Sequence, residues 1–150
     1  MTKYETMCET YKHKQVVNQF IGDVIKELIF RGVNHDNSKI GEFEVDIFTE
    51  YTPKLANSTF GSDEYKQFLK EMKPALDHHY SENKHHPEHF ENGVLGMDLI
   101  DLLEMICDWK AAALRHNNGD IMKSVEVNQE RFGYSDELKQ IFINTIKNQF

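Results

Sequence analysis

Residues 97–116 read MDLIDLLEMICDWKAAALRH, and they form the most apolar helical segment expected in the 150-residue chain. The apolar residues recur at the spacing of an α-helix, so the stretch predicts a helix with one side turned to the core. The three residues that follow, Asn117-Asn118-Gly119, are typical of a break, and we expect the helix to end there. The residues expected to face the core are Leu99, Leu102, Leu103, Ile106 and Trp109.

Helical periodicity extends over most of the chain, and no segment shows a convincing period-two pattern of a strand. Gly32 and Thr52-Pro53 are expected to end helices, and a loop is expected over residues 54–61. Ser62 and Ser135 are expected N-caps, and a kink or restart is expected at Pro74. The expected helices cover residues 5–31, 34–51, 63–83, 97–116, 120–132 and 136–148.

The length indicates a single domain over residues 1–150, and the helical periodicity indicates an all-α helical bundle of about five to seven helices. Hydrophobic residues make up 39% of the chain, which is enough for one core at this length. Only three prolines and eight glycines interrupt the chain, so long helices are expected.

The chain is acidic, because 17 Lys and Arg residues against 25 Asp and Glu residues leave a formal charge of -8. This charge disfavours nucleic acid as a partner, since a phosphate backbone is held largely by positive side chains. It suits a small ligand held through a metal, which supplies positive charge locally. No apolar run approaches the roughly 18 residues of a membrane span, so no membrane partner is expected.

The cysteines and the N-terminal segment favour a cytoplasmic protein. Cys8 and Cys107 lie far apart in the sequence and form no CxxC motif, which is typical of a reduced protein, although a disulfide between them stays open. The segment MTKYETMCETYKHK lacks the apolar core of a signal peptide.

Five of the eight histidines fall within residues 78–89, which read HHYSENKHHPEH. Uncoordinated imidazoles gain little from clustering at neutral pH, whereas neutral imidazole is the commonest metal ligand in proteins. We therefore expect a metal site here, in which at least one or two of the five are spectators or hold other ligands in place, and the alternative is a solvated polar loop. The expected ligands are His78, His79, His85 and His86.

Two further candidate ligand sets precede this cluster. His13 shares a helix face with Val17 and Phe20, so it is expected to point inward, where the alternative is a packed core histidine. His35 and Asp36 offer an imidazole nitrogen and a carboxylate oxygen, a suitable mix for a divalent first-row metal. The alternative for this pair is an ordinary capping region at the start of a helix.

Three acidic residues share a face of the apolar helix: Asp101, Glu104 and Asp108. A carboxylate at the edge of an apolar face is costly unless it is paired or bound to a metal. For Asp101 and Glu104 a solvated acidic stripe is an equal alternative. Asp108, between Cys107 and Trp109, is expected to be functional.

The order of these residues resembles the HD-domain superfamily, an all-helical fold named for its His-Asp metal ligands, whose members mostly hydrolyse phosphate esters of nucleotides. By this resemblance His13 is the first family histidine, and His35 and Asp36 are the defining pair. Asp108 is then the late aspartate that closes the first metal site. The histidine pairs at 78–79 and 85–86 resemble the extra histidines with which some branches hold a second metal.

The sequence departs from the cyclic-dinucleotide branch of that superfamily. HDNSK is similar to the HDxGK motif and places Lys39 on its lysine, but Ser38 replaces the glycine. The HHxxxGxGYP segment is absent, and HHPEHF stands nearby instead. The HHPEHF string looks more like an uncharacterised HD-related family of phages and bacteria, which implies no assigned substrate.

The resemblance implies a metal-dependent phosphohydrolase that acts on a small phosphorylated molecule such as a nucleotide. One divalent metal would be held by His13, His35, Asp36 and Asp108, and Asp36 would bridge to a second metal held by the histidines of residues 78–89. The expected metal is Mn, Fe, Co, Zn or Mg, as one or two ions that activate a water molecule. Catalytic roles are expected for Lys39, His79 and His86; Lys39 would contact a phosphate oxygen, unless it is a surface lysine paired with an acid.

Two other functions remain open from the sequence. Some HD relatives hold two irons and oxidise carbon with dioxygen, and abundant histidines favour iron as well as other first-row metals. A non-enzymatic helical module with a structural metal is the other alternative. Aromatic residues near Phe142 and Phe150, expected to be exposed, leave room for a homodimer.

Overall fold

The structure, a computed structural model, describes residues 1–59, 62–115 and 119–150, and it confirms the expected all-α class. Within these ranges the chain forms seven α-helices and three short 3-10 helices, and no strand. The chain divides into two compact units, residues 1–34 and residues 35–150. That residues 1–150 act as one HD-like domain stays a prediction.

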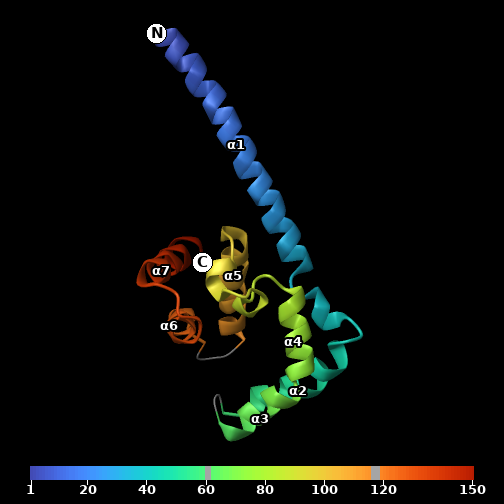
Figure 1. The fold of residues 1–150 in the computed structure, drawn as a ribbon. Coiled ribbons are helices and arrows are strands. Elements are labelled where there is room, and N and C mark those ends of the chain that lie inside the picture. The colour runs from blue at the N-terminus through green and yellow to red at the C-terminus, as the bar shows by residue number, and fades with distance from the viewer. Residues whose placement is uncertain (60–61, 116–118) are drawn as a thin grey trace. The chain divides into compact units, whose positions relative to one another are not determined.

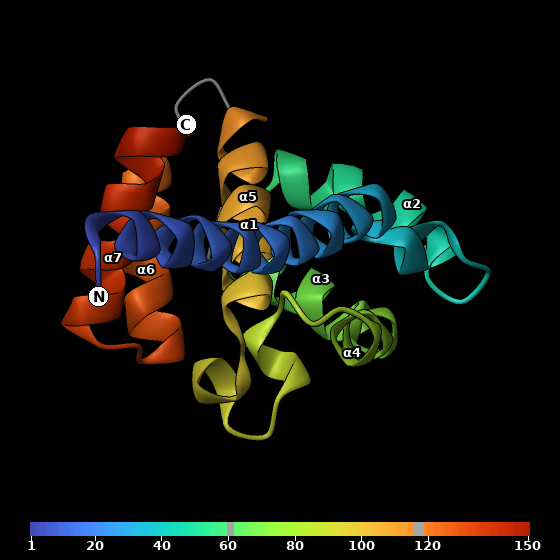
Figure 2. The ribbon, with the colours of Figure 1, turned by 90° about the horizontal axis from the view of Figure 1, so that it is seen from above.

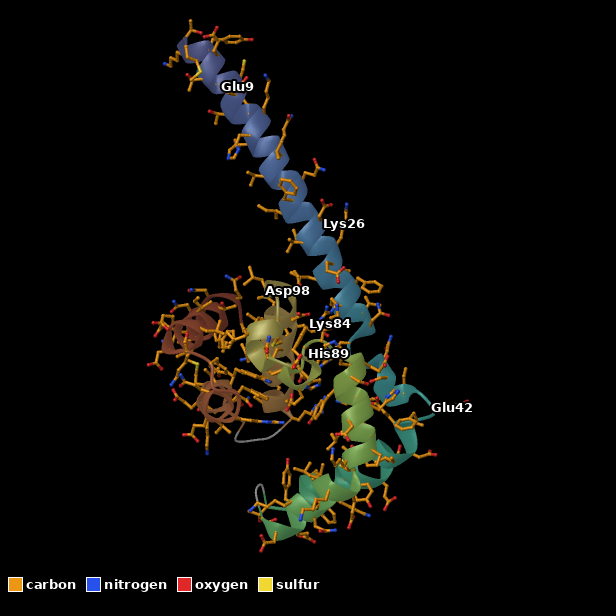
Figure 3. All side chains as sticks on the ribbon, in the orientation of Figure 1. Glu9, Lys26, Glu42, Lys84, His89 and Asp98 are labelled. Carbon is orange, nitrogen blue, oxygen red and sulfur yellow. The ribbon has the colours of Figure 1, made fainter. Side chains whose placement is uncertain are left out.

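The first unit is a single long helix, α1 (Lys3–Asn34). Pairs of charges three residues apart line it, as in Glu9 with Lys12 and Asp23 with Lys26, and Figure 3 labels Glu9 and Lys26 on this helix. The expected end at Gly32 is wrong, because a capping glycine needs a positive φ, which in the described chain is adopted by Gly93 and Gly133 but not by Gly32.

The C-terminal half of the second unit contains its main core. This core is formed by α5 (Leu99–Leu114), α6 (Ile121–Phe132) and α7 (Asp136–Gln149), which lie side by side (Figures 1 and 2). The ring of Trp109 meets the rings of Tyr134 and Phe142 at centroid distances of 6.4 and 6.1 Å. The buried members of the core are Val94, Met105, Ile106, Ile121, Val125, Tyr134, Phe142 and Ile146.

Two side chains of this half lie elsewhere than expected. Leu99 is 75% exposed, because it is the first residue of α5 and lies at the helix end beyond the packed side. Phe142 is buried in the core rather than exposed, so it offers no surface for a homodimer, and only Phe150 is exposed as expected. Asn117 and Asn118, expected to break α5, lie outside the described residues, and α5 ends at Leu114.

The N-terminal half of the second unit begins with a 3-10 helix, η1 (Asn37–Ile40), where a longer helix from residue 34 was expected. The regular helix α2 (Val45–Asn57) starts only after a turn at residues 41–44 and continues through Pro53, so the expected loop over residues 54–57 is wrong. Proline removes one helical hydrogen bond, but α2 packs against α3 on both sides of it, with the ammonium of Lys54 over the rings of Tyr51 and Phe68.

The remaining elements follow the expected caps. Ser62 caps α3 (Asp63–Glu71) by accepting from the Tyr65 amide, and Ser135 caps α7 in the same way. Pro74 lies in the first turn of α4 (Lys73–Glu82), where its missing N–H costs nothing. Two 3-10 helices, η2 (Pro87–His89) and η3 (Gly93–Gly96), lead on to α5. No helix in the described part of the chain is long and apolar enough to cross a bilayer.

Candidate metal centre

The candidate ligands of the second unit come from three separate parts of its chain. His35 and Asp36 directly precede η1, and Asp108 lies in the middle of α5. His79 lies in the last turn of α4, and His85 and His86 lie in the connection to η2, directly after Lys84 (labelled in Figure 3). Their side chains converge into two overlapping groups, one of Asp36, His79, His85 and His86 and one of His35, His85 and Asp108.

The first group brings three imidazole nitrogens and one carboxylate oxygen within 4.8 Å of one another. The Oδ1 atom of Asp36 lies 3.2 Å from Nε2 of His79 and 3.4 Å from Nε2 of His85. The Nε2 atoms of His79 and His86 lie 2.9 Å apart. Two ligands held about 2.1 Å from a metal at tetrahedral or octahedral angles lie about 2.9–3.4 Å from each other. The spacing of these atoms therefore fits the coordination shell of one metal ion.

Two polar atoms of this group are buried without a hydrogen-bond partner among the described residues: Asp36 Oδ1 and His85 Nε2. Burying such an atom without a partner costs about 1–3 kcal/mol, and nearly all buried polar atoms avoid this cost. The two atoms lie 3.4 Å apart, and an oxygen with imidazole nitrogens is a donor set that divalent first-row metals prefer. The residues present therefore fit a metal ion.

The second group is more open. Nε2 of His35 lies 3.5 Å from Oδ1 of Asp108 and 3.6 Å from Oδ2 of Asp36. The side chains of His35 and Asp108 are partly exposed, whereas those of His79 and His85 are almost fully buried. Asp36 thus turns one oxygen to each group, and this arrangement would allow its carboxylate to bridge two ions.

Two glutamates lie behind the rings. Glu44, which is fully buried just before α2, accepts hydrogen bonds at its two oxygens from Nδ1 of His78 and Nδ1 of His79, over 2.6 and 3.1 Å. Oε1 of Glu104 on α5 lies 2.8 Å from Nδ1 of His35 and 3.1 Å from Nδ1 of His85. Glu104 is therefore no part of a solvated stripe, and Glu44 carries no sequence signal, since it lies at least 34 residues from the rings it holds.

The acidic and basic groups shift one another's protonation. Burial alone would raise the pKa of Asp36, but the imidazoles of His79 and His85 and the ammonium of Lys39 outweigh it and hold that pKa well below its usual range. Interactions with Asp108 and Glu104 raise the pKa of His35 to about 10. Burial, together with the neighbouring rings of His85 and His79, lowers the pKa of His86 to about 3.

Asp36 adopts a strained backbone conformation at the centre of the site. Its φ of 57° and ψ of 18° lie in the left-handed region, and it is the one described residue other than glycine with a positive φ. Such conformations persist where the surrounding structure requires them and are common at functional sites. Here the conformation places the carboxylate between the two ligand groups and also within 2.6 Å of the ammonium of Lys39.

Of the other residues that the sequence singled out, those of the second unit belong to neither ligand group. His78 belongs to neither group, because its Nδ1 bonds Glu44 and its ring lies against that of Phe43. His89 is held by the carbonyl oxygen of Tyr80. His13 lies on α1, in the first unit, and its role as a ligand stays a prediction. Asp101 is buried at the start of α5, where it accepts a hydrogen bond from the backbone N–H of Asp98.

Residues 2–148 match a protein family described as "Family of unknown function (DUF5662)". No curated protein and no solved structure matches the chain. The description of the family names no activity, so the resemblance to the HD-domain superfamily stays a prediction. Because the match spans nearly the whole chain, the protein belongs to the DUF5662 family.

Proposed function

We propose that this protein is a metal-dependent phosphohydrolase that cleaves a small phosphate ester such as a nucleotide. The observation that carries the proposal is the convergence of buried imidazole nitrogens on Asp36 Oδ1, an atom without a hydrogen-bond partner in the described chain. A bound divalent metal would lower the pKa of a water molecule and neutralise charge on phosphate oxygens. We infer one ion in the group of Asp36, His79, His85 and His86, and a second ion beside it at His35 and Asp108.

The partial exposure of one side of the ligand set supports a catalytic rather than a structural site. A structural zinc site is closed by four protein ligands, whereas a catalytic site keeps a position open. Asp36 and Asp108 retain partly exposed side chains, and His35 between them is also reached by solvent. A small anion could therefore reach this side of the group, while His79 and His85 stay shielded.

Lys39 supports a phosphorylated substrate. Its ammonium lies 2.6 Å from Oδ2 of Asp36 and 5.3 Å from the centre of the Phe48 ring, so its position is defined from two sides. With its side chain 35% exposed, it could donate to a phosphate oxygen that approaches Asp36. In a chain of net charge -8 this local positive charge would add to that of the metal in holding an anionic substrate.

The test combines metal analysis with an activity panel. The chain purified without added metal is analysed for bound first-row metals, and it is then assayed on nucleotides and a generic phosphodiester with manganese, cobalt or magnesium. We expect stoichiometric metal and hydrolysis of at least one substrate, both lost in Asp36→Ala and in His85→Ala and both kept in His89→Gln. Retention of metal in Asp36→Ala and His85→Ala would refute the proposed centre.

The same experiment separates the proposal from its rivals. Two bound irons with a visible absorption band, and no hydrolysis, would favour an oxygenase of the HD type. One tightly bound zinc with no activity on any substrate would favour a structural site in a non-enzymatic module.

A further inference from the structure

Two carboxylates of the second unit, Glu44 and Glu104, each contact the Nδ1 atoms of two imidazoles. Glu44 binds His78 with one oxygen and His79 with the other, and Glu104 binds both His35 and His85 with the single atom Oε1. All four contacts involve the Nδ1 atom of the ring. Proteins commonly orient a metal-binding histidine in this way: one ring nitrogen donates to an acid, and the other is directed at the metal.

The chemistry of a carboxylate decides which ring nitrogen carries the proton. An ionised carboxylate accepts hydrogen bonds and donates none, so the contacts with Glu44 and Glu104 favour a hydrogen on each Nδ1. At His79 the Ser38 hydroxyl and the Asn83 amide also lie 3.0 and 3.1 Å from Nδ1, so there the carboxylate competes with two possible donors. A neutral imidazole has one hydrogen on its two nitrogens, and Nε2 is then left with a free lone pair. His79 and His85 direct this Nε2 at Asp36 Oδ1.

Glu44 lies inside a buried network of hydrogen bonds. The residue is fully buried, and its Oε2 also accepts from the hydroxyl of Ser38 over 3.2 Å. The Ser38 hydroxyl in turn accepts from the side-chain amide of Asn83, which also donates to the backbone carbonyl of His79. The ring of His79 is therefore held at its backbone and at Nδ1 by one connected network.

We propose that Glu44 and Glu104 are positioning residues of the metal centre, which hold His79 and His85 in the tautomer whose bare Nε2 can bind a metal. The inference rests on the metal centre of the proposed function and adds two residues that the ligand groups do not contain. Glu104 also joins the two groups, because it holds His35 of the second group and the shared His85 with one oxygen. Loss of Glu104 should therefore weaken both metal positions, whereas loss of Glu44 should weaken only the first.

The test uses Glu44→Met and Glu104→Met, which keep the volume of the side chain but remove the acceptor, beside Glu44→Gln and Glu104→Gln, which keep one acceptor oxygen. In Glu44→Gln the amide oxygen can face His79 and the amide nitrogen His78, which lies outside the ligand groups. We expect metal affinity, measured by titration calorimetry, to fall about 10–100-fold in each Met variant and less in each Gln variant. Glu42→Met, an exposed position on the turn before α2 (Figure 3), is the matched control and should bind like the parent chain.

A second measurement needs no metal. Long-range proton–nitrogen NMR spectra of the metal-free protein, at a pH where the rings are neutral, report which nitrogen of His79 and of His85 carries hydrogen. We expect Nδ1–H in the parent chain and in the Gln variants, and a share of Nε2–H at His79 in Glu44→Met and at His85 in Glu104→Met. A merely structural role would leave these tautomers unchanged.

The outcomes separate the inference from the proposed function. A parent chain in which His79 and His85 carry hydrogen on Nε2 overturns the inference even where a Met variant fails to fold. Met variants that bind metal as tightly as the parent chain also overturn it, while the metal centre itself stands. A parent chain that binds no metal but shows the expected tautomers refutes the proposed function and leaves the role of the two glutamates in place.

Discussion

The Nε2 atom of His86 lies 2.9 Å from the Nε2 atom of His79, although the Nδ1 atom of His79 already faces the carboxylate of Glu44. The lone pair of His79 Nε2 therefore points at a second imidazole nitrogen. A neutral His86 that carries its hydrogen on Nε2 can donate it to this lone pair, so in the metal-free protein the contact is a hydrogen bond. A bound cation would take the place of that hydrogen between the two rings.

This relationship makes the stability of His86→Gln informative. The glutamine amide can also donate to His79 Nε2, so we expect the metal-free variant to be about as stable as the parent chain. Metal at about 100 times its dissociation constant should add about 2.7 kcal/mol to the free energy of unfolding of the parent chain and much less to that of the variant. Urea denaturation with and without manganese or zinc measures both quantities.

The control for this variant is His89→Gln. His89 lies in the same histidine-rich segment, but its Nδ1 bonds the Tyr80 carbonyl oxygen and it belongs to neither ligand group. It should keep the full stabilisation by metal. An equal gain in His86→Gln and in the parent chain would show that His86 is no ligand.

The protonation of His35 predicts a pH dependence of the metal-free protein. Interactions with Asp108 and Glu104 raise the pKa of His35 to about 10 in the folded state, against about 6.5 in an unfolded chain. A raised pKa adds stability that is fully present below about pH 6.5 and is lost as the pH rises towards 10. We expect the free energy of unfolding to fall over this window, and to fall less steeply in His35→Gln. Urea denaturation at a series of pH values tests this, and parallel curves for both proteins would contradict it.

The backbone conformation of Asp36 predicts that a glycine variant is more stable than an alanine variant, which is the reverse of the usual order in a helix. Both Asp36→Gly and Asp36→Ala remove the carboxylate, but only glycine adopts a φ of 57° without strain. We expect the glycine variant to be more stable than the alanine variant by about 1 kcal/mol in the metal-free protein, measured by chemical denaturation.

A pair of substitutions in the middle of α6 provides the comparison. Glu126→Gly and Glu126→Ala both remove the ion pair with Lys139, and in a helix alanine should be the more stable by roughly 0.5–1 kcal/mol. The same order at both positions would mean that Asp36 is not strained.

The core formed by α5, α6 and α7 predicts a large loss of stability in Phe142→Ala. The Phe142 ring is 1% exposed and meets the Tyr134 ring edge to face at a centroid distance of 5.2 Å. Removing it should cost about 3–5 kcal/mol in urea denaturation, because the neighbouring rings cannot close the cavity. Ile141→Ala on the exposed side of α7 should change stability by less than about 0.5 kcal/mol. Equal effects of the two substitutions would place the core elsewhere.

The helical class and most helix caps follow from local features of the sequence. Ser62, Pro74 and Ser135 act through hydrogen bonds and backbone angles within one turn, so they are visible without any tertiary contact. Gly32 and Pro53 misled the prediction because neither residue by itself ends a helix. Whether a helix ends at Gly32 depends on the φ angle of that residue. Whether a helix ends at Pro53 depends on the packing of α2 against α3.

The histidine pairs show the limit of the sequence most directly. Consecutive residues of a helix point about 100° apart, so only one ring of His78 and His79 can face the centre. The structure buries His79 against Asp36 and leaves His78 between Glu44 and Phe43. Nothing in the dipeptide itself distinguishes the two rings.

The sequence by itself determined the helical class, the abundance of imidazoles in residues 78–89, and a wider set of candidate ligands that includes Asp36, His79, His85 and His86. Which atoms meet was decided only by the tertiary structure, since a ligand group needs side chains many residues apart to approach within a few ångströms. Glu44 is the clearest case: an ordinary glutamate in the sequence, it becomes an acceptor for two imidazoles only when α4 packs against the segment before α2.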